Sequence, residues 1–151
     1  MLLINEQINS NLESKLEIEM SWSTPNTVSR VHIVFEVVGK GKVILELVRH
    51  LSPITFSNMI KILPFSGRLH FLGHNIGYVE TGLNVGAEKQ KSVFKRGDLG
   101  FMISNGSICV VLQDIKGIHM NHLGHCVEDP LLLESIESGE IIFIKRSPHE
   151  K

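Results

Sequence analysis

The sequence predicts a mainly β domain, an antiparallel barrel or sandwich with two short helices, on three observations. Two apolar runs flank a glycine turn in "RVHIVFEVVGKGKVILELV", which is typical of a hairpin. From residue 68 to residue 112 there is no helical period, only short apolar runs broken by "GHN", "TGLN", "KRGD" and "SNGS". Two other segments, 52–63 and 129–139, carry helix start and stop signals.

The two helices are predicted from their end residues and their apolar spacing. In the first, Ser52 is the expected N-cap and Pro53 fits the first turn, and apolar residues follow at spacings of three and four. In the second, Asp129 is the expected N-cap and Gly139 the stop. The runs "GDLGFMI", "SICVVLQ" and "EIIFIKR" are the clearest remaining strands.

The domain organisation is predicted as an N-terminal extension (1–29), a barrel domain (30–146) and a tail (147–151). The extension combines a loose polar arm with one further strand, "LEIEMSW", in which apolar residues alternate with acidic or small ones. We expect this strand to pair with an exposed edge of its own barrel or of a neighbouring one.

Composition narrows the function classes. A length of 151 residues suits one domain, and a net charge of −1 provides no global field toward nucleic acid or an anionic membrane. Cys109 and Cys126 both lie in apolar runs, as buried thiols in a reducing compartment do. No signal peptide or membrane span is visible, so we expect a soluble, cytoplasmic protein without nucleic-acid or membrane partners. The sequence does not indicate the oligomeric state.

Three segments in order carry a resemblance to a known family. "VHIVFEVVGKGKVILELVRHLSPITFSNMIKIL", "GDLGFMISNGS" and "LGHCVEDPLLLESIESGEIIFIKR" together resemble the cyclophilins over roughly residues 30 to 146. The short length, "LPFSGRLHFLG" and "RGDLGFM…NGSICVVL" are more narrowly similar to a small prokaryotic cyclophilin-like family of uncharacterised function. The resemblance implies a closed antiparallel cyclophilin-like β-barrel with two short capping helices.

The resemblance also implies that prolyl isomerase activity is lost. Cyclophilins use an arginine that hydrogen-bonds near the prolyl nitrogen, and alignment of the family's "F-H-R" on "LHF" puts Phe71 at that position. Arg68 lies three residues earlier and offers an alternative guanidinium. The glutamine and aromatic residues of the family's groove correspond to Ile108, Cys109 and Val110.

The predicted function is therefore a binding module whose barrel groove holds an unknown small molecule or an extended peptide. No cofactor is expected, and no catalytic residue is assigned. A weak peptidyl-prolyl cis-trans isomerase is the first alternative. The residues expected to line the groove are His70, Phe71, Met102, Ile108, Val110, His119 and His122.

The octet "HMNHLGHC" raises a second alternative, a metal site. His119, His122, His125 and Cys126 carry the donor atoms that zinc prefers. On a regular strand, however, the middle histidine faces away from the other two, so convergence requires an irregular loop. The simpler interpretation is that these side chains cover a barrel rim and hydrogen-bond to carbonyl groups.

A cupin-like metal-dependent enzyme is the third possibility, because "GRLHFLGHNIGYVETG" places His70, His74 and Glu80 close together in sequence. Cupins space their two histidines by two residues on one strand face, whereas these are four apart across a glycine. The remaining charged segments, including Glu134 with Glu137 and the basic run "KQKSVFKR", are predicted to be solvated surface, with an anionic ligand as the minor alternative for the run.

Overall fold

The computed structural model describes residues 28–148, and nine strands make up most of that range. The predicted strand at 16–22 and most of the predicted tail lie outside the described residues. No helix within 28–148 is long and apolar enough to cross a membrane. The strands are β2 (Arg30–Val37), β3 (Gly41–Val48), β4 (Phe65–Leu72), β5 (Ile76–Glu80), β6 (Lys91–Phe94), β7 (Asp98–Met102), β8 (Ser107–Val111), β9 (Ile115–Cys126) and β10 (Ile141–Arg146).

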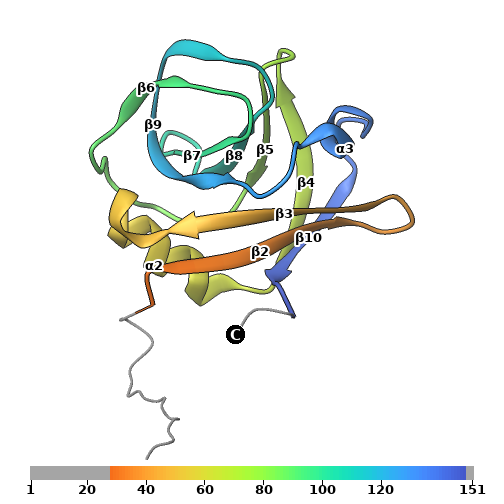
Figure 1. Cartoon of the computed structure of the whole chain (residues 1–151), viewed down its shortest axis with the longest axis horizontal. Helices are drawn as coiled ribbons and strands as arrows, with labels where there is room; N and C mark the ends of the chain where they lie inside the picture. Colours follow the sequence, from red (N-terminus) through yellow and green to blue (C-terminus); the bar gives the residue numbers. More distant parts are fainter. Residues whose placement is uncertain (1–27, 149–151) are drawn as a thin grey trace, which may run out of the picture.

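Eight of these strands form a closed antiparallel barrel (Figure 1). The hydrogen-bonded order is β3-β2-β10-β4-β5-β8-β7-β9, and a pairing of β9 with β3 closes the ring. The ninth strand, β6, pairs with the first half of β9 and extends the sheet beyond the barrel. The predicted mainly β class and the closed barrel are therefore confirmed, as are the first hairpin and the three strands singled out in the sequence.

Alternation along the strands places apolar side chains inside the barrel. In β2 the residues Val31, Ile33, Phe35 and Val37 all belong to one buried cluster, to which every other barrel strand contributes. Their neighbours along the strand point outward, because successive side chains of a strand face opposite sides. This period of two is the pattern from which the hairpin was predicted.

A smaller core lies on the outside of the barrel, under β6. It consists of Ile76, Phe94, Cys109, Val111, Ile115 and Met120. The sulfur and terminal methyl of Met120 lie directly over Gly100, where a Cβ would be only 2.9 Å from the methyl carbon. A side chain at this position would therefore require the end of the Met120 side chain to shift.

The first helix, α2 (Pro53–Ile62), is confirmed, but its cap differs from the prediction. Ser52 makes no capping bond with its side chain, which instead donates to the carbonyl of His122 at 2.7 Å. The carboxylate of Glu88, from the loop between β5 and β6, accepts from the amides of Ile54 and Thr55 at 2.9 and 2.8 Å. The cap thus comes from a residue distant in sequence, which local pattern cannot identify.

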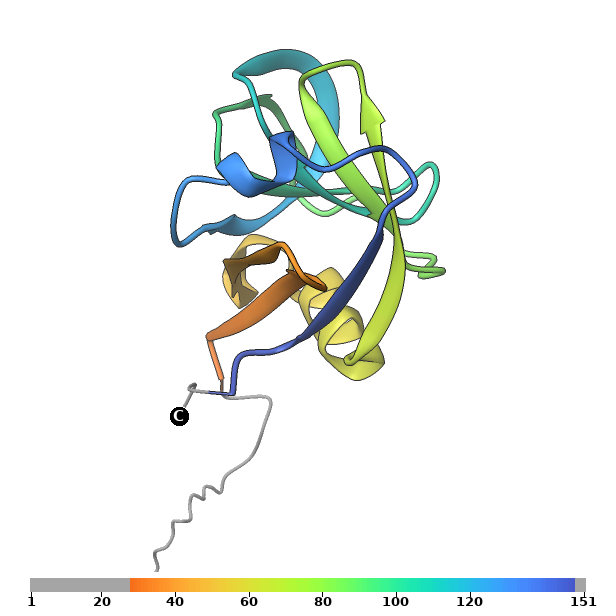
Figure 2. The same ribbon diagram turned by 90° about the vertical axis from the view of Figure 1, so that its right-hand side faces the viewer.

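The second helix is much shorter than predicted. Only Leu131–Glu134 forms a helical turn, α3, and Pro130 rather than Asp129 occupies the N-cap position. Asp129 instead binds Arg96, as described below. Figures 1 and 2 show α2 and α3 well apart on the barrel, and both contribute buried side chains to its core. A short 3-10 turn, η2 (Arg49–Leu51), precedes α2.

The histidine octet does not lie in the irregular loop that the metal alternative requires. Residues 119–126 belong to β9, a strand of 12 residues that pairs with β6, β7 and β3 in turn. A bulge interrupts the pairing with β7. Leu99 pairs with Gly124, but the next residue, Gly100, pairs with His122. Leu123 is the extra residue, and its side chain lies in the barrel core.

Candidate functional site

A cavity of about 390 Å³ opens at the end of the barrel where the β4–β5 turn, the end of β8 and α3 meet. Three of its lining side chains are apolar and come from the barrel interior and the segment after α3. The others come from the β4–β5 turn, from the segment after β8 and from α3. The lining residues are Phe71, Gly73, His74, Leu112, Gln113, Glu134 and Ile136.

The floor of the cavity is apolar because it continues the barrel core. Phe71 points inward from β4 opposite Gly77 of β5, and it packs against the main core cluster. A Cβ at Gly77 would lie 3.5 Å from the Phe71 ring and 3.4 Å from Leu69. Both are ordinary van der Waals distances, so the ring lies directly over this glycine, and Leu112 and Ile136 complete the apolar surface.

The rim is polar and is held by backbone hydrogen bonds. The amides of Leu112 and Gln113 both donate to the carbonyl of Asn75, at 2.7 and 3.3 Å, which fixes the end of β8 against the β4–β5 turn. Gly73 has a φ of 60°, which favours glycine in this turn and lets His74 project at the rim. An imidazole and an amide group therefore flank the opening.

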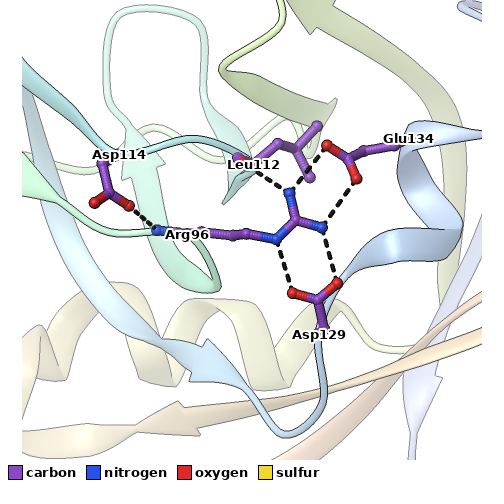
Figure 3. A network of polar contacts seen from close by, with 5 residues as sticks. All are labelled: Arg96, Leu112, Asp114, Asp129 and Glu134. Carbon is purple, nitrogen blue, oxygen red and sulfur yellow. Dashed lines mark hydrogen bonds and ion pairs between the residues drawn. The ribbon is translucent and has the colours of Figure 1, made fainter.

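Arg96 holds the third side of the rim in place (Figure 3). Its Nε and Nη2 donate to both carboxylate oxygens of Asp129 at 2.7 and 2.8 Å, and Nη2 and Nη1 donate to the two oxygens of Glu134 at 2.9 Å each. Nη1 also donates to the carbonyl of Leu112 at 2.7 Å, so all five N–H donors are used. Its backbone amide donates to Asp114. This network, here called the Arg96 clasp, joins β8 to α3.

The clasp also sets the charge of the cavity. The hydrogen bonds from Arg96 lower the pKa of Glu134, and the same guanidinium lowers the pKa of Asp129. Both carboxylates are therefore ionised and paired with a guanidinium whose own pKa is raised by them. Glu134 is the only carboxylate among the lining residues of the cavity, and its charge is already balanced.

The seven predicted groove residues do not lie together. Phe71 faces the inside of the barrel, as do Ile108 and Val110, which are fully buried in the main core. Met102 packs against the smaller core outside the barrel. Whether the set binds a ligand stays a prediction, but the structure places only Phe71 at the cavity.

Two of the predicted histidines line up on the outer face of the barrel instead. His70 of β4 faces Tyr78 of β5 with ring centroids 5.5 Å apart. His122 packs edge-on against Phe94 at 5.9 Å, and its Nε2 lies 3.1 Å from the Gly124 carbonyl. Burial, and next the charge of Lys91, lower the pKa of His122. His119 is exposed on β9.

The β9 bulge brings two histidines of the octet to one face. Because one residue is inserted between them, His122 and His125 both point outward although they are three apart, opposite Gly100 and Asp98. His125 lies 3.1 Å from a carboxylate oxygen of Glu46, which also pairs with His32 on the neighbouring strand. The bulge thus places two of the three histidines on one face, and the partner of His125 is a carboxylate.

The candidate metal ligands do not form a metal-binding group. Within residues 28–148, no three His, Cys, Asp or Glu side chains are placed to hold an ion together. Cys126 packs against the barrel core, and burial raises the pKa of its thiol to about 12. The cupin-type set is also dispersed, since His70 faces Tyr78, His74 lies in the turn at the cavity rim and Glu80 is exposed at the end of β5.

The alternative isomerase guanidinium is engaged elsewhere. Arg68 is on β4 opposite Ile141, and its Nη1 donates to the carbonyl of Gly139 at 2.8 Å. Phe71 points into the barrel from the other face of the same strand, because the two residues are three apart. Arg68 therefore does not reach the Phe71 ring from the position it holds.

Sequence reasoning missed most of the cavity. Arg96 lies in the run "KQKSVFKR" that was interpreted as solvated surface, and Glu134 was interpreted as an exposed helix residue. Gln113 was not singled out. No local pattern distinguishes these residues, because the Arg96 clasp joins positions 33 and 38 residues apart along the chain.

Comparison with known proteins supports the fold. No protein-family model matches the chain, and no curated protein matches it. Among solved structures, the chain is similar to the solution structure of the hypothetical protein AF2241 from Archaeoglobus fulgidus, with a TM-score of 0.64 and 23% sequence identity. The alignment covers 79% of this chain and 95% of that chain. At this identity the likeness shows a shared fold alone, and a cyclophilin-like identity stays a prediction.

Proposed function

We propose that this protein is a binding module that holds a small, uncharged molecule in the cavity at the end of its barrel. The observation that carries the proposal is the cavity itself: about 390 Å³, with an apolar floor and a few polar groups converging at the rim. Small-molecule sites are commonly concave and of roughly 300–1,000 Å³, with a few polar groups that fix the orientation of the ligand.

The charge of the cavity favours an uncharged ligand. Glu134 is the only carboxylate in the lining, and the Arg96 clasp already satisfies both of its oxygens. A cationic ligand would have to compete with a bidentate guanidinium, which is a strong partner for a carboxylate. Hydrogen bonds to His74 and Gln113, and contact with Phe71, remain available to a neutral molecule with one apolar, flat portion.

Prolyl isomerisation is not part of the proposed function. Lowering a rotation barrier of about 18–20 kcal/mol requires a donor aimed at the position where the prolyl nitrogen changes its bonding. Phe71 offers no donor, and the nearby guanidinium of Arg68 donates to Gly139. The predicted loss of this activity therefore stands as part of the proposal.

The test is a screen of fragment-sized neutral compounds by thermal shift, followed by amide spectra of the full chain. Hits are expected to perturb Gly73, His74, Gln113 and Ile136. In the double variant His74→Ala/Gln113→Ala, affinity should fall about tenfold, the loss of one to two hydrogen bonds. Hits that instead perturb Tyr78 and Cys109 would overturn the site.

The matched control is His50→Ala/Gln90→Ala, which removes the same two residue types away from the cavity. It should leave affinity unchanged. A proline-peptide exchange assay completes the test, with exchange expected at the uncatalysed rate. Turnover comparable to that of an active isomerase would contradict the proposed non-catalytic role.

A further inference from the structure

A second hollow, of about 470 Å³, lies across β2, β10 and the start of β4, away from the cavity. We call it the β10 groove. Its only charged side chains, Glu36 and Lys145, form an ion pair at 2.9 Å, so the groove is close to neutral. Its lining residues are Glu36, Val38, Pro64, Phe65, Ser66, Phe143, Ile144 and Lys145.

The strand at the centre of this groove is apolar on both faces. Ile142 and Ile144 are fully buried in the barrel core, as expected for inward positions. Their outward neighbours Ile141 and Phe143 are each 45% exposed, and Val38 nearby is 70% exposed. A barrel strand with one solvated face normally alternates apolar with polar residues, whereas a continuous apolar run is typical of a strand covered on both faces.

An additional strand cannot cover this face by edge pairing. β10 is hydrogen-bonded to β2 on one side and to β4 on the other, and β2 is itself paired with β3. The occupant must therefore lie over the strands as a second layer and make contact through its side chains.

The N-terminal extension contains a segment with the required pattern. In "LEIEMSW", the residues Leu16, Ile18, Met20 and Trp22 alternate with acidic or small residues. In an extended conformation they present four apolar side chains on one side and Glu17, Glu19 and Ser21 on the other. The apolar side would suit the neutral, apolar groove, and the polar side would face water.

The extension is also long enough to reach. The seven residues Ser23–Ser29 connect the segment to β2 and span at most about 25 Å when extended. Lys145, at the near end of the groove, pairs with Val34 of β2. Val34 is four residues from Arg30, so the near end of the groove lies about 13 Å from the start of β2. The end of β10 lies beside the first half of β2, where Arg146 pairs with Ile33.

We infer that residues 16–22 dock across the β10 groove of the same chain and cover Val38, Ile141 and Phe143. The own chain is favoured over a second copy because a short linker holds the segment at a millimolar effective concentration. This docking is independent of the proposed small-molecule site, which lies at the other hollow and shares no lining residue with the groove.

Trp22 reports on the docking directly, since it is the only tryptophan of the chain. In the full-length protein its emission should be blue-shifted, and its quenching by acrylamide reduced, relative to the chain unfolded in urea. Both signals should be independent of protein concentration. Emission equal to that of the unfolded chain, or burial that grows with concentration, would overturn docking within one chain.

Variants in the segment itself leave the barrel untouched. Ile18→Ser/Met20→Ser should lower the docking equilibrium constant by at least about a hundredfold and return Trp22 to the exposed state. The opposite-phase control Glu17→Ser/Glu19→Ser should retain the blue shift. Equal behaviour of the two double variants would contradict the inference.

The groove side is tested by Phe143→Ser, with Leu131→Ser, another exposed apolar residue outside the groove, as the control. Trp22 should become exposed in Phe143→Ser and stay buried in Leu131→Ser. An unchanged Trp22 signal in folded Phe143→Ser protein would overturn the assignment of the groove. Should Phe143→Ser fail to fold, the two segment variants decide the question alone.

Discussion

At the scale of single residues, the pKa of His122 is set by where its imidazole lies in the fold. Burial against Phe94, and next the charge of Lys91, lower its pKa, while Asp98 acts in the opposite sense. Protonation of His122 therefore favours the unfolded chain, in which the imidazole has its ordinary pKa of about 6.5. The contribution of His122 to the free energy of unfolding is fully present above this pH and is lost as the pH falls below it.

We accordingly expect the free energy of unfolding to fall as the pH drops below about 7.5, and His122→Gln to make that fall shallower. Glutamine keeps a donor for the Gly124 carbonyl without the charge. Urea unfolding at a series of pH values measures the slope. His119→Gln, at an exposed position on the same strand, should keep the original slope, and the same slope in both variants would contradict the assignment.

At the scale of elements, the loop between β5 and β6 is tied to α2 by one side chain. Glu88 accepts from the amides of Ile54 and Thr55 and from the Thr55 hydroxyl, while its own amide donates to Asn121 of β9. A carboxylate at this end of a helix also interacts favourably with the helix dipole. The helix, the loop and β9 are therefore stabilised together.

Removal of the Glu88 side chain should lower the free energy of unfolding and loosen the start of α2. Glu88→Ala is expected to lower the free energy of unfolding by about 1–2 kcal/mol, the usual value for loss of an N-cap. The amides of Ile54 and Thr55 should also exchange hydrogen faster. Glu128→Ala, which removes an exposed carboxylate after β9, serves as the control. If both variants lose the same small amount, the cap does not have the stabilising role assigned to it.

At the scale of the whole molecule, closure of the barrel depends on a short seam. Only three residue pairs join β3 to β9, and the pair Leu47 with Gly124 is one of them. A Cβ on Gly124 would collide with the backbone carbonyl of Glu46 and would lie 3.1 Å from the Cα of Leu47. Backbone atoms cannot move aside as a flexible side chain can, so the seam requires a glycine.

Gly124→Ala should therefore destabilise the fold by more than about 2 kcal/mol, because relief of the collision requires the two strands to separate. Gly86→Ala is the control, since a Cβ there meets no atom within 4 Å. Thermal and urea unfolding of both variants measure the difference. A cost below about 0.5 kcal/mol for Gly124→Ala would show that the seam tolerates displacement.

The strands could be predicted from sequence because their signal is local. Alternation in β2 and β3, the glycine turn between them and the apolar runs of β7, β8 and β10 each lie within a few consecutive residues. The α2 helix was found for the same reason, from its spacing and Pro53. The predicted second helix is a single turn in the structure, and Asp129, its expected N-cap, binds Arg96.

The residue pattern by itself determined a mainly β chain of antiparallel strands and left open whether they form a barrel or a sandwich. Only the tertiary structure showed which polar side chains lie together. The bulge at Leu123 turned His122 and His125 to one face, and the Arg96 clasp collected residues from distant elements around the cavity. The physical reason is range: alternation acts between neighbours, whereas a site forms where the closed sheet brings separated residues within hydrogen-bond distance.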